Sequence, residues 1–209
     1  MEKDPLIAIV MATMIEAKPF VTGMSMQQIE KKPFVIFKQD NILLAISGIG
    51  KTNAAIATAY CCQRFNPAGV CNLGAAGAAD LTHRLGDVFH ITKIIEHDRP
   101  ELTSGKPTIH QPDVLDGFLT AILSTSDRAI LDPDERSLIS ENADLMDMEG
   151  ASVTRACRIF ETKCHIFKFV SDTPEHTKDN DIIQNIRLYR TPFYQFFNRS
   201  IIHRLLHYG

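Results

Sequence analysis

Short apolar runs recur along the chain, and glycines, acids or polar clusters bound most of them. Runs of about five to eight such residues are typical of strands that are buried on both faces. Two of the runs flank Gln39-Asp40-Asn41 and predict a hairpin. We therefore expect strands over Leu6–Met11, Phe34–Lys38, Ile42–Ile46, Ala68–Leu73, Val88–Ile95, Asp144–Met148 and His165–Val170.

The segments between these runs have helical spacing or high helix propensity. After the first strand, Pro19 should delay the start of a helix. The polar segment Arg99–Gln111 contains two prolines and predicts a surface loop, whereas Phe118–Ser124 fits either a strand or a short helix. Helices are predicted over Lys51–Phe65, Asp132–Asn142, Gly150–Phe160 and Ile182–Tyr208.

This alternation of strands and helices predicts an α/β fold with a central, largely parallel or mixed sheet flanked by helices. A length of 209 residues is enough for one domain with a sizeable core. The sequence contains no internal repeat and no low-complexity segment. We therefore expect a single domain over residues 1–209.

Composition narrows the possible partners. A formal charge of −3 argues against nucleic acid as the main partner, because phosphate binding needs a basic surface. The N-terminal apolar run is too short for a signal peptide or a membrane span, so no membrane partner is expected. Five cysteines without C-x-x-C spacing indicate neither a disulfide framework nor a zinc site, and they favour a reducing cytoplasm.

Two glycine turns come close to known phosphate-binding motifs. Gly50-Lys51-Thr52 has the ending of a P-loop, but Ala45 occupies the position where that motif requires glycine. Gly74-Ala75-Ala76-Gly77 follows a strand but lacks the third glycine of a dinucleotide fingerprint. A tight turn and a backbone that closely approaches a flat ligand are equally good interpretations of this second motif.

Three acids stand where predicted strands end. Glu16 follows the first strand, Glu149 follows Asp144–Met148, and Asp172 follows His165–Val170. Taken singly, Glu149 is an ordinary acid in the first turn of a helix and Asp172 an ordinary cap. Ligands bind beyond the carboxyl ends of strands in open α/β sheets, so the three together favour a site. They could polarise a water, hold a sugar hydroxyl and protonate a leaving group, which suits cleavage of a glycosidic bond.

The chain resembles the nucleoside phosphorylase/nucleosidase family, and is most similar to its 5′-methylthioadenosine/S-adenosylhomocysteine nucleosidases. The order and spacing of five segments are more specific than any one of them. They are Met14-Ile15-Glu16, Ser47-Gly48-Ile49-Gly50-Lys51, Asn72-Leu73-Gly74-Ala75-Ala76-Gly77, Asp147-Met148-Glu149 and Val170-Ser171-Asp172.

The resemblance implies a purine nucleoside as substrate and no cofactor or metal. Glu16 would activate water, and Asp172 would deliver a proton to N7 of the base. Glu149 would hold the ribose hydroxyls, with the Met148 side chain beneath the sugar. It also implies a homodimer whose partner closes the 5′ end of the pocket, with contacts around Ile49 and Val88–Ile95. The further substrate-binding residues that it implies are Ile49, Ala75, Gly77, Arg128, Ile130 and Ser171.

Departures from the family pattern bear on the substrate more than on the reaction. Ala75 replaces a usual serine, Lys168 a usual arginine, and Ala129 the phenylalanine that stacks on the purine. Ala129 cannot stack on the base, so weak binding of methylthioadenosine is expected if no other ring, such as Phe169 or Phe193, takes that place. Arg128 beside Ala129 could bind a carbonyl or an anionic group. Asn72 stands where the phosphorylases carry arginine, which favours water over phosphate as the attacking group. A futalosine-type hydrolase, a purine nucleoside phosphorylase and a non-catalytic nucleoside-binding protein remain alternatives.

Overall fold

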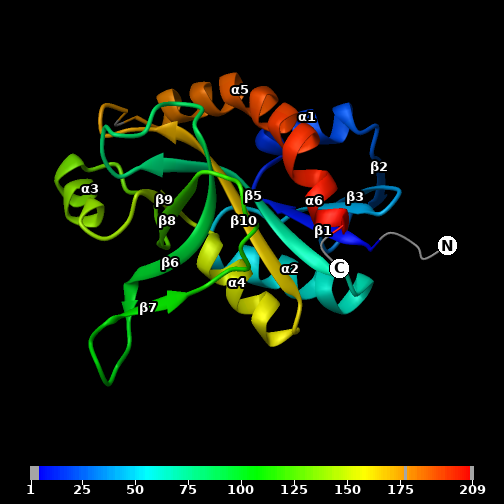
Figure 1. Cartoon of the computed structure of the whole chain (residues 1–209), viewed down its shortest axis with the longest axis horizontal. Helices are drawn as coiled ribbons and strands as arrows, with labels where there is room; N and C mark the ends of the chain where they lie inside the picture. The colour runs from blue at the N-terminus through cyan, green and yellow to red at the C-terminus, as the bar shows by residue number, and fades with distance from the viewer. Residues whose placement is uncertain (1–4, 177, 208–209) are drawn as a thin grey trace.

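The structure is a computed structural model that describes residues 5–176 and 178–207. Ten strands form one twisted sheet, and helices cover both of its faces (Figure 1). The strands are β1 (Ile7–Met11), β2 (Gln27–Glu30), β3 (Val35–Gln39), β4 (Ile42–Ile46), β5 (Gly69–Ala78), β6 (Val88–Pro100), β7 (Pro107–His110), β8 (Thr120–Thr125), β9 (Leu145–Asp147) and β10 (Lys163–Asp172). The helices are α1 (Met14–Gly23), α2 (Lys51–Phe65), α3 (Pro133–Ser140), α4 (Gly150–Ile159), α5 (Asp179–Phe196), a π-helical turn (Phe197–Ile201) and α6 (Ile202–His207).

The sheet is mixed, and its pairing brings several strand ends together. Strand β1 lies parallel to β4 and β5, and β5 lies parallel to β10. Strand β6 runs antiparallel to β10 and parallel to β8, and β9 joins β8 to β5. These pairings close a ring of five strands, from which β1, β4, β3 and β2 extend outward. The predicted α/β fold with a central mixed sheet is therefore confirmed.

Two apolar layers hold the helices on the sheet. Helices α2 and α4 pack on one face, with Cys61 and Cys157 among the buried residues of that layer. Helices α1 and α5 cover the other face around Phe20 and Phe193, whose rings meet edge to face at 5.9 Å. Such aromatic pairs stabilise a core beyond the burial of their area. No helix within the described residues is both long and apolar enough to cross a membrane.

The expected effect of Pro19 is wrong. Helix α1 begins at Met14, immediately after its N-cap Thr13, and Pro19 lies inside it. Proline lacks the N–H that would bond to the carbonyl four residues earlier, which is that of Ile15. The Arg190 guanidinium of α5 supplies this bond instead, with Nη1 at 2.7 Å from the Ile15 oxygen. A side chain distant in sequence thus makes the proline tolerable.

Two other expectations about local structure are also wrong. Strand β5 continues through Gly74–Gly77, where a turn was one interpretation, because these residues pair with β10, with a shift in register before Asp172. Residues 99–111 are not simply a loop, since β6 extends to Pro100 and forms a hairpin with β7. The ambiguous segment Phe118–Ser124 contains strand β8. The hairpin of β3 and β4 is confirmed.

The segment Val88–Ile95 does not offer the apolar contact surface that was expected of it. Phe89, Ile91, Ile94 and Ile95 are buried in the core of their own chain. They are therefore unavailable to a partner subunit, in contrast to Ile49, which is 56% exposed.

Candidate active site

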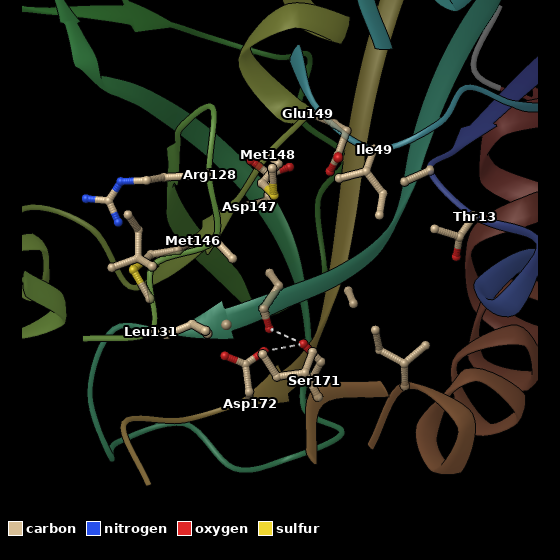
Figure 2. A pocket seen from close by; sticks show the side chains of 18 of the residues that line it. Thr13, Ile49, Arg128, Leu131, Met146, Asp147, Met148, Glu149, Ser171 and Asp172 are labelled. Atoms are coloured by element: carbon tan, nitrogen blue, oxygen red, sulfur yellow. Dashed lines mark hydrogen bonds between the residues drawn. The ribbon is translucent and has the colours of Figure 1, made fainter. Parts of the chain in front are cut away.

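A cavity of about 290 Å³ opens at the carboxyl ends of β1, β5, β9 and β10 (Figure 2). Loops and helices that follow these strands complete its walls, including part of α5. Every residue that the sequence marked as catalytic or substrate-binding lines this one cavity. They are Glu16, Ile49, Ala75, Gly77, Arg128, Ile130, Met148, Glu149, Ser171 and Asp172. Their individual roles remain predictions.

Glu16 is held rigidly in the first turn of α1, which follows β1. Its Oε2 accepts the backbone N–H of Thr13 at 3.1 Å and the Thr13 hydroxyl at 2.7 Å, in a capping box for α1. Its Oε1 accepts the N–H of Ala75 at 2.9 Å. The side chain is buried. Its carboxylate bonds to the N-cap of α1 and to strand β5, and it lines the cavity. This arrangement fixes both oxygens of a carboxylate that lines the cavity.

A buried lysine balances the acids near Glu149. Lys168 is 1% exposed, and its Nζ lies 2.8 Å from Asp147 Oδ2. Asp147 also accepts the Thr125 hydroxyl at 2.6 Å and the Gly150 N–H at 2.8 Å. Burial lowers the pKa of Lys168, but the carboxylates of Asp147 and Glu149 outweigh it and raise the pKa overall. A charged lysine therefore stands behind Glu149.

Glu149 titrates in an unusual range. Burial and the neighbouring charge of Asp147 raise its pKa to about 7, against the opposing effects of Lys168 and of the Gly50 N–H. That N–H donates to Glu149 Oε1 at 2.8 Å. Gly50 has a φ of +99°, which favours glycine and turns its N–H toward the acid. The turn at Gly50 thus provides a backbone N–H that binds the Glu149 carboxylate in the cavity.

The resemblance of this turn to a P-loop has another explanation. Lys51 is buried and its Nζ contacts Asp98 at 2.8 Å, Glu96 at 3.1 Å and Asp127 at 3.4 Å. A lysine surrounded by three acids is not available to bind phosphates. We therefore assign Lys51 a structural role beside the cavity.

Asp172 is bound on both oxygens. Its Oδ1 accepts the Ser171 hydroxyl at 2.6 Å, and its Oδ2 contacts Nη2 of Arg136 at 2.5 Å. Arg136 also donates from Nε to the Ile130 carbonyl at 2.9 Å and from Nη1 to the Ala78 carbonyl at 3.1 Å. Both members of the pair are buried, with Arg136 1% exposed. A second charged group therefore stands beside the predicted acid and lines the same cavity.

Sequence reasoning missed Arg136 and selected Arg128 instead. The Arg128 side chain is 66% exposed and pairs with Glu135 at 2.6 Å. Figure 2 shows it extending away from Met148 and Glu149. Arg136 lies in the hydrophilic helix α3, where it is the one buried residue. Its sequence neighbours give no sign of this burial; the only available signal was the need of a buried acid for a counter-charge.

The cavity contains no substitute for the missing phenylalanine. Among the described residues that line it, none is aromatic. Phe169 and Phe193 are buried in the core with centroids 5.0 Å apart and do not line the cavity, so neither ring takes its place. The walls are instead aliphatic, with Ile182, Ile183 and Ile186 contributed by α5.

The described residues include no group of three or more His, Cys, Asp or Glu side chains placed to hold a metal ion. The acids of the cavity are bonded to backbone N–H groups, hydroxyls and cationic side chains instead. Each of these acids is therefore held in place by partners within the protein.

Comparison with known proteins places this cavity in a family context. The model of the phosphorylase superfamily matches residues 7–141. The aminodeoxyfutalosine nucleosidase of Campylobacter jejuni is 27% identical over 162 residues, which are 66% of this chain and 71% of that one. The 5′-methylthioadenosine/S-adenosylhomocysteine nucleosidase of Bacillus velezensis is 31% identical over 157 residues, covering 63% and 68% of the two chains.

A solved structure extends the similarity to nearly the whole chain. The 5′-methylthioadenosine nucleosidase of Arabidopsis thaliana in its apo form superposes with a TM-score of 0.85 at 21% identity. The alignment covers 99% of this chain and 98% of that one. At this identity the likeness establishes the fold. The family model ends before Glu149 and Asp172, so the argument for these two acids rests on the cavity itself.

Proposed function

This chain belongs to the phosphorylase superfamily, and from that premise we propose that it hydrolyses the N-glycosidic bond of a purine nucleoside modified at its 5′ position, releasing the free base. The observation that carries the proposal is the meeting of Glu16, Glu149 and Asp172 around one cavity. Cleavage of this bond passes through a transition state with positive charge on the sugar and negative charge on the base. The three acids are distributed to act on the two charges.

Glu16 is the base that activates water. Its two oxygens are fixed by Ala75 and Thr13, and a fixed carboxylate can orient a water molecule and accept its proton. Phosphate is disfavoured as the attacking group because phosphate binding requires available cations. Asn72 stands at the position where the resemblance places the arginine of the phosphorylases, and its Nδ2 group donates to the Val10 carbonyl. In the described cavity lining, Arg128 pairs with Glu135, and Arg136 lies beside Asp172, on the side of the base rather than of the attacking group.

Glu149 holds the ribose hydroxyls over the Met148 side chain. To accept hydrogen bonds from two ribose hydroxyls, Glu149 must be ionised. Lys168 and the Gly50 N–H both favour the ionised state. An ionised Glu149 near the sugar also stabilises its developing positive charge.

Asp172 delivers the proton to the departing base. The Ser171 hydroxyl has one proton but two acceptors within reach, Asp172 Oδ1 and the Ala76 carbonyl oxygen at 3.2 Å, which are the two dashed lines in Figure 2. Ser171 and Arg136 thus hold both oxygens of Asp172 at the cavity wall. A proton shared between Asp172 and N7 of a bound purine neutralises the departing base, while Oδ2 accepts from Arg136.

The 5′ substituent lies against the aliphatic wall. Ile49 and the α5 isoleucines suit an apolar group such as a methylthio group, and one relative is named for methylthioadenosine. Another is named for aminodeoxyfutalosine, which keeps a futalosine-type substrate as the second candidate. The two substrates share the glycosidic bond and the reaction.

The test is a panel of purine nucleosides that differ in their 5′ groups, with the free base and the sugar product measured separately. We expect free base and a sugar without phosphate, at a rate that added phosphate leaves unchanged. A phosphorylated sugar would place the chain among the phosphorylases. Tight binding of nucleosides without any cleavage would identify a non-catalytic binding protein.

The proposal includes a homodimer in the cytoplasm. Ile49 is exposed at the cavity rim, where a second chain would close the 5′ end. The five cysteines are free thiols, which suits a reducing compartment.

A further inference from the structure

We propose that Arg136 reads the base of the substrate and that this base is a 6-oxopurine, with a carbonyl at C6, rather than a 6-aminopurine such as adenine. The inference rests on the proposed function, because it assumes a purine in the cavity with N7 at Asp172. It adds the identity of the base, for which the sequence had offered only the exposed Arg128.

Arg136 is positioned as a binding residue. Its Nε, Nη1 and Nη2 atoms each donate one bond, to Ile130, Ala78 and Asp172 respectively. A guanidinium has five N–H groups, so these acceptors within the described structure leave two unused. The residue is 1% exposed and lines the cavity. Buried N–H groups without an acceptor destabilise the protein, because they have lost their hydrogen bonds to water. A ligand that accepts hydrogen bonds from them removes this destabilisation.

The edge of a purine that meets Asp172 distinguishes the two kinds of base. N7 and the substituent at C6 lie side by side on this edge. A 6-oxopurine presents two acceptors there, N7 and O6, whereas adenine presents the N7 acceptor and an amino donor. Asp172 and Arg136 lie side by side at the cavity wall, with Oδ2 2.5 Å from Nη2. With N7 at Asp172, a carbonyl at C6 comes within reach of the Arg136 N–H groups. An amino group at C6 would instead direct its own N–H groups toward those of Arg136.

The same contact assists departure of the base. As the glycosidic bond breaks, negative charge develops on the purine ring and on O6. A buried guanidinium stabilises that charge more strongly than water does, because the cavity is a site of low polarity. Gly77 leaves room for the pair, since a Cβ there would lie 2.6 Å from Asp172 Oδ2 and 3.4 Å from Arg136 Nη2.

The experiment compares nucleosides that differ only at C6: 5′-methylthioinosine with 5′-methylthioadenosine, and inosine with adenosine. We expect the wild-type kcat/KM to favour the 6-oxo member of each pair by about tenfold to a hundredfold, the usual discrimination of a good side-chain contact to a base edge. Arg136→Met should abolish this preference and Arg136→Lys should restore part of it. If Arg136 has only a structural role, the variants should lower kcat/KM equally for both substrates and leave the ratio unchanged. The matched control is Arg155→Met, on the exposed face of α4.

Binding of the free bases to the wild-type protein, measured by calorimetry, covers the case in which the Arg136 variants do not fold. Tighter binding of hypoxanthine than of adenine supports the inference, and the reverse order overturns it. A wild-type preference for the 6-amino nucleosides also overturns it while leaving the proposed hydrolysis intact. If no nucleoside is cleaved, the proposed function fails, and the order of base binding still decides the role of Arg136.

Discussion

At the scale of single residues, the cavity collects more negative than positive charge. Among the described residues, Glu16, Asp147, Glu149 and Asp172 are buried there, and the buried cations in contact with them are Lys168 and Arg136. Each cation is closest to one acid, Lys168 to Asp147 and Arg136 to Asp172. Burial and the charge of Asp147 outweigh Lys168 and the Gly50 N–H at Glu149, and its pKa is raised to about 7.

The pKa of Glu149 predicts how activity depends on pH. If Glu149 must be ionised to hold the sugar, kcat/KM should fall about tenfold per pH unit below pH 7 and level off above it. A pH–rate profile on the cleaved nucleoside measures this. Lys168→Met, which removes the opposing cation, should move the acid limb to higher pH. A limb near pH 4.5, the ordinary value for glutamate, would show that Glu149 is not the titrating group.

The same shift has a consequence for stability. A folded-state pKa above the unfolded value means that the native state binds more protons between about pH 4.5 and pH 7, so stability falls as pH rises through that window. Above pH 7 the ionised Glu149 lowers the free energy of unfolding by its full amount, on the order of 3 kcal/mol, because each unit of pKa shift corresponds to about 1.36 kcal/mol. Glu149→Gln should therefore raise the melting temperature at pH 8 and leave it nearly unchanged at pH 4, while reducing activity. Unfolding curves at the two pH values test this.

Asp172→Asn should lower the turnover rate by about 10² to 10⁴, because asparagine cannot supply the acid proton. Its side-chain oxygen can still accept from Arg136, so the variant should fold, although with a lower melting temperature because the buried arginine loses its counter-charge. Asp134→Asn, on the exposed part of α3, is the matched control. Wild-type turnover in Asp172→Asn would refute the assignment of this acid.

At the scale of elements, the sequence predicted most strands because buried runs are a local signal, and it failed where the cause was distant. Pro19 is accommodated by Arg190 of α5, and Gly74–Gly77 remains extended because β10 pairs with it. The predicted site residues do meet at one cavity, since each follows or ends a strand of the same sheet. Arg136 was missed because its partner Asp172 lies 36 residues away, beyond what a local pattern can report.

Strand β5 predicts the effect of two small substitutions. A Cβ at Gly74 would lie 2.9 Å from Glu16 Oε1, and one at Gly77 would lie 2.6 Å from Asp172 Oδ2. Gly74→Ala and Gly77→Ala should each displace a carboxylate and lower kcat by about 10² or more, given how steeply rate depends on placement. In the same strand, a Cβ at Gly69 meets only ordinary contacts at 3.7 Å, so Gly69→Ala should retain activity. Full activity in both cavity variants would contradict the geometry of the acids.

At the scale of the whole molecule, the sheet brings together acids that lie far apart in the sequence. The parallel strands β1, β5 and β10 end at one edge, and β9 reaches the same edge through its pairing with β5. The register places Asp172 opposite Gly77 of β5, and Ala75 of the same strand bonds to Glu16. One strand thus sets the positions of the acids predicted to act on the water and on the base.

Assembly is the property of the whole molecule that depends most on the cavity rim. Ile49 is 56% exposed, lines the cavity and lies next to Gly50, whose N–H binds Glu149. If a second chain covers Ile49, light scattering should give about twice the 23.4 kDa of one chain. Ile49→Glu should shift the protein toward the single-chain mass, since a charge buried in an apolar contact is strongly unfavourable. It should also lower activity, because the 5′ end of the cavity would be left open to water. Leu188→Glu on α5, at a residue 64% exposed and outside the cavity lining, should change neither property. A wild-type protein that is fully active as a single chain at micromolar concentration would show that the cavity is complete without a partner.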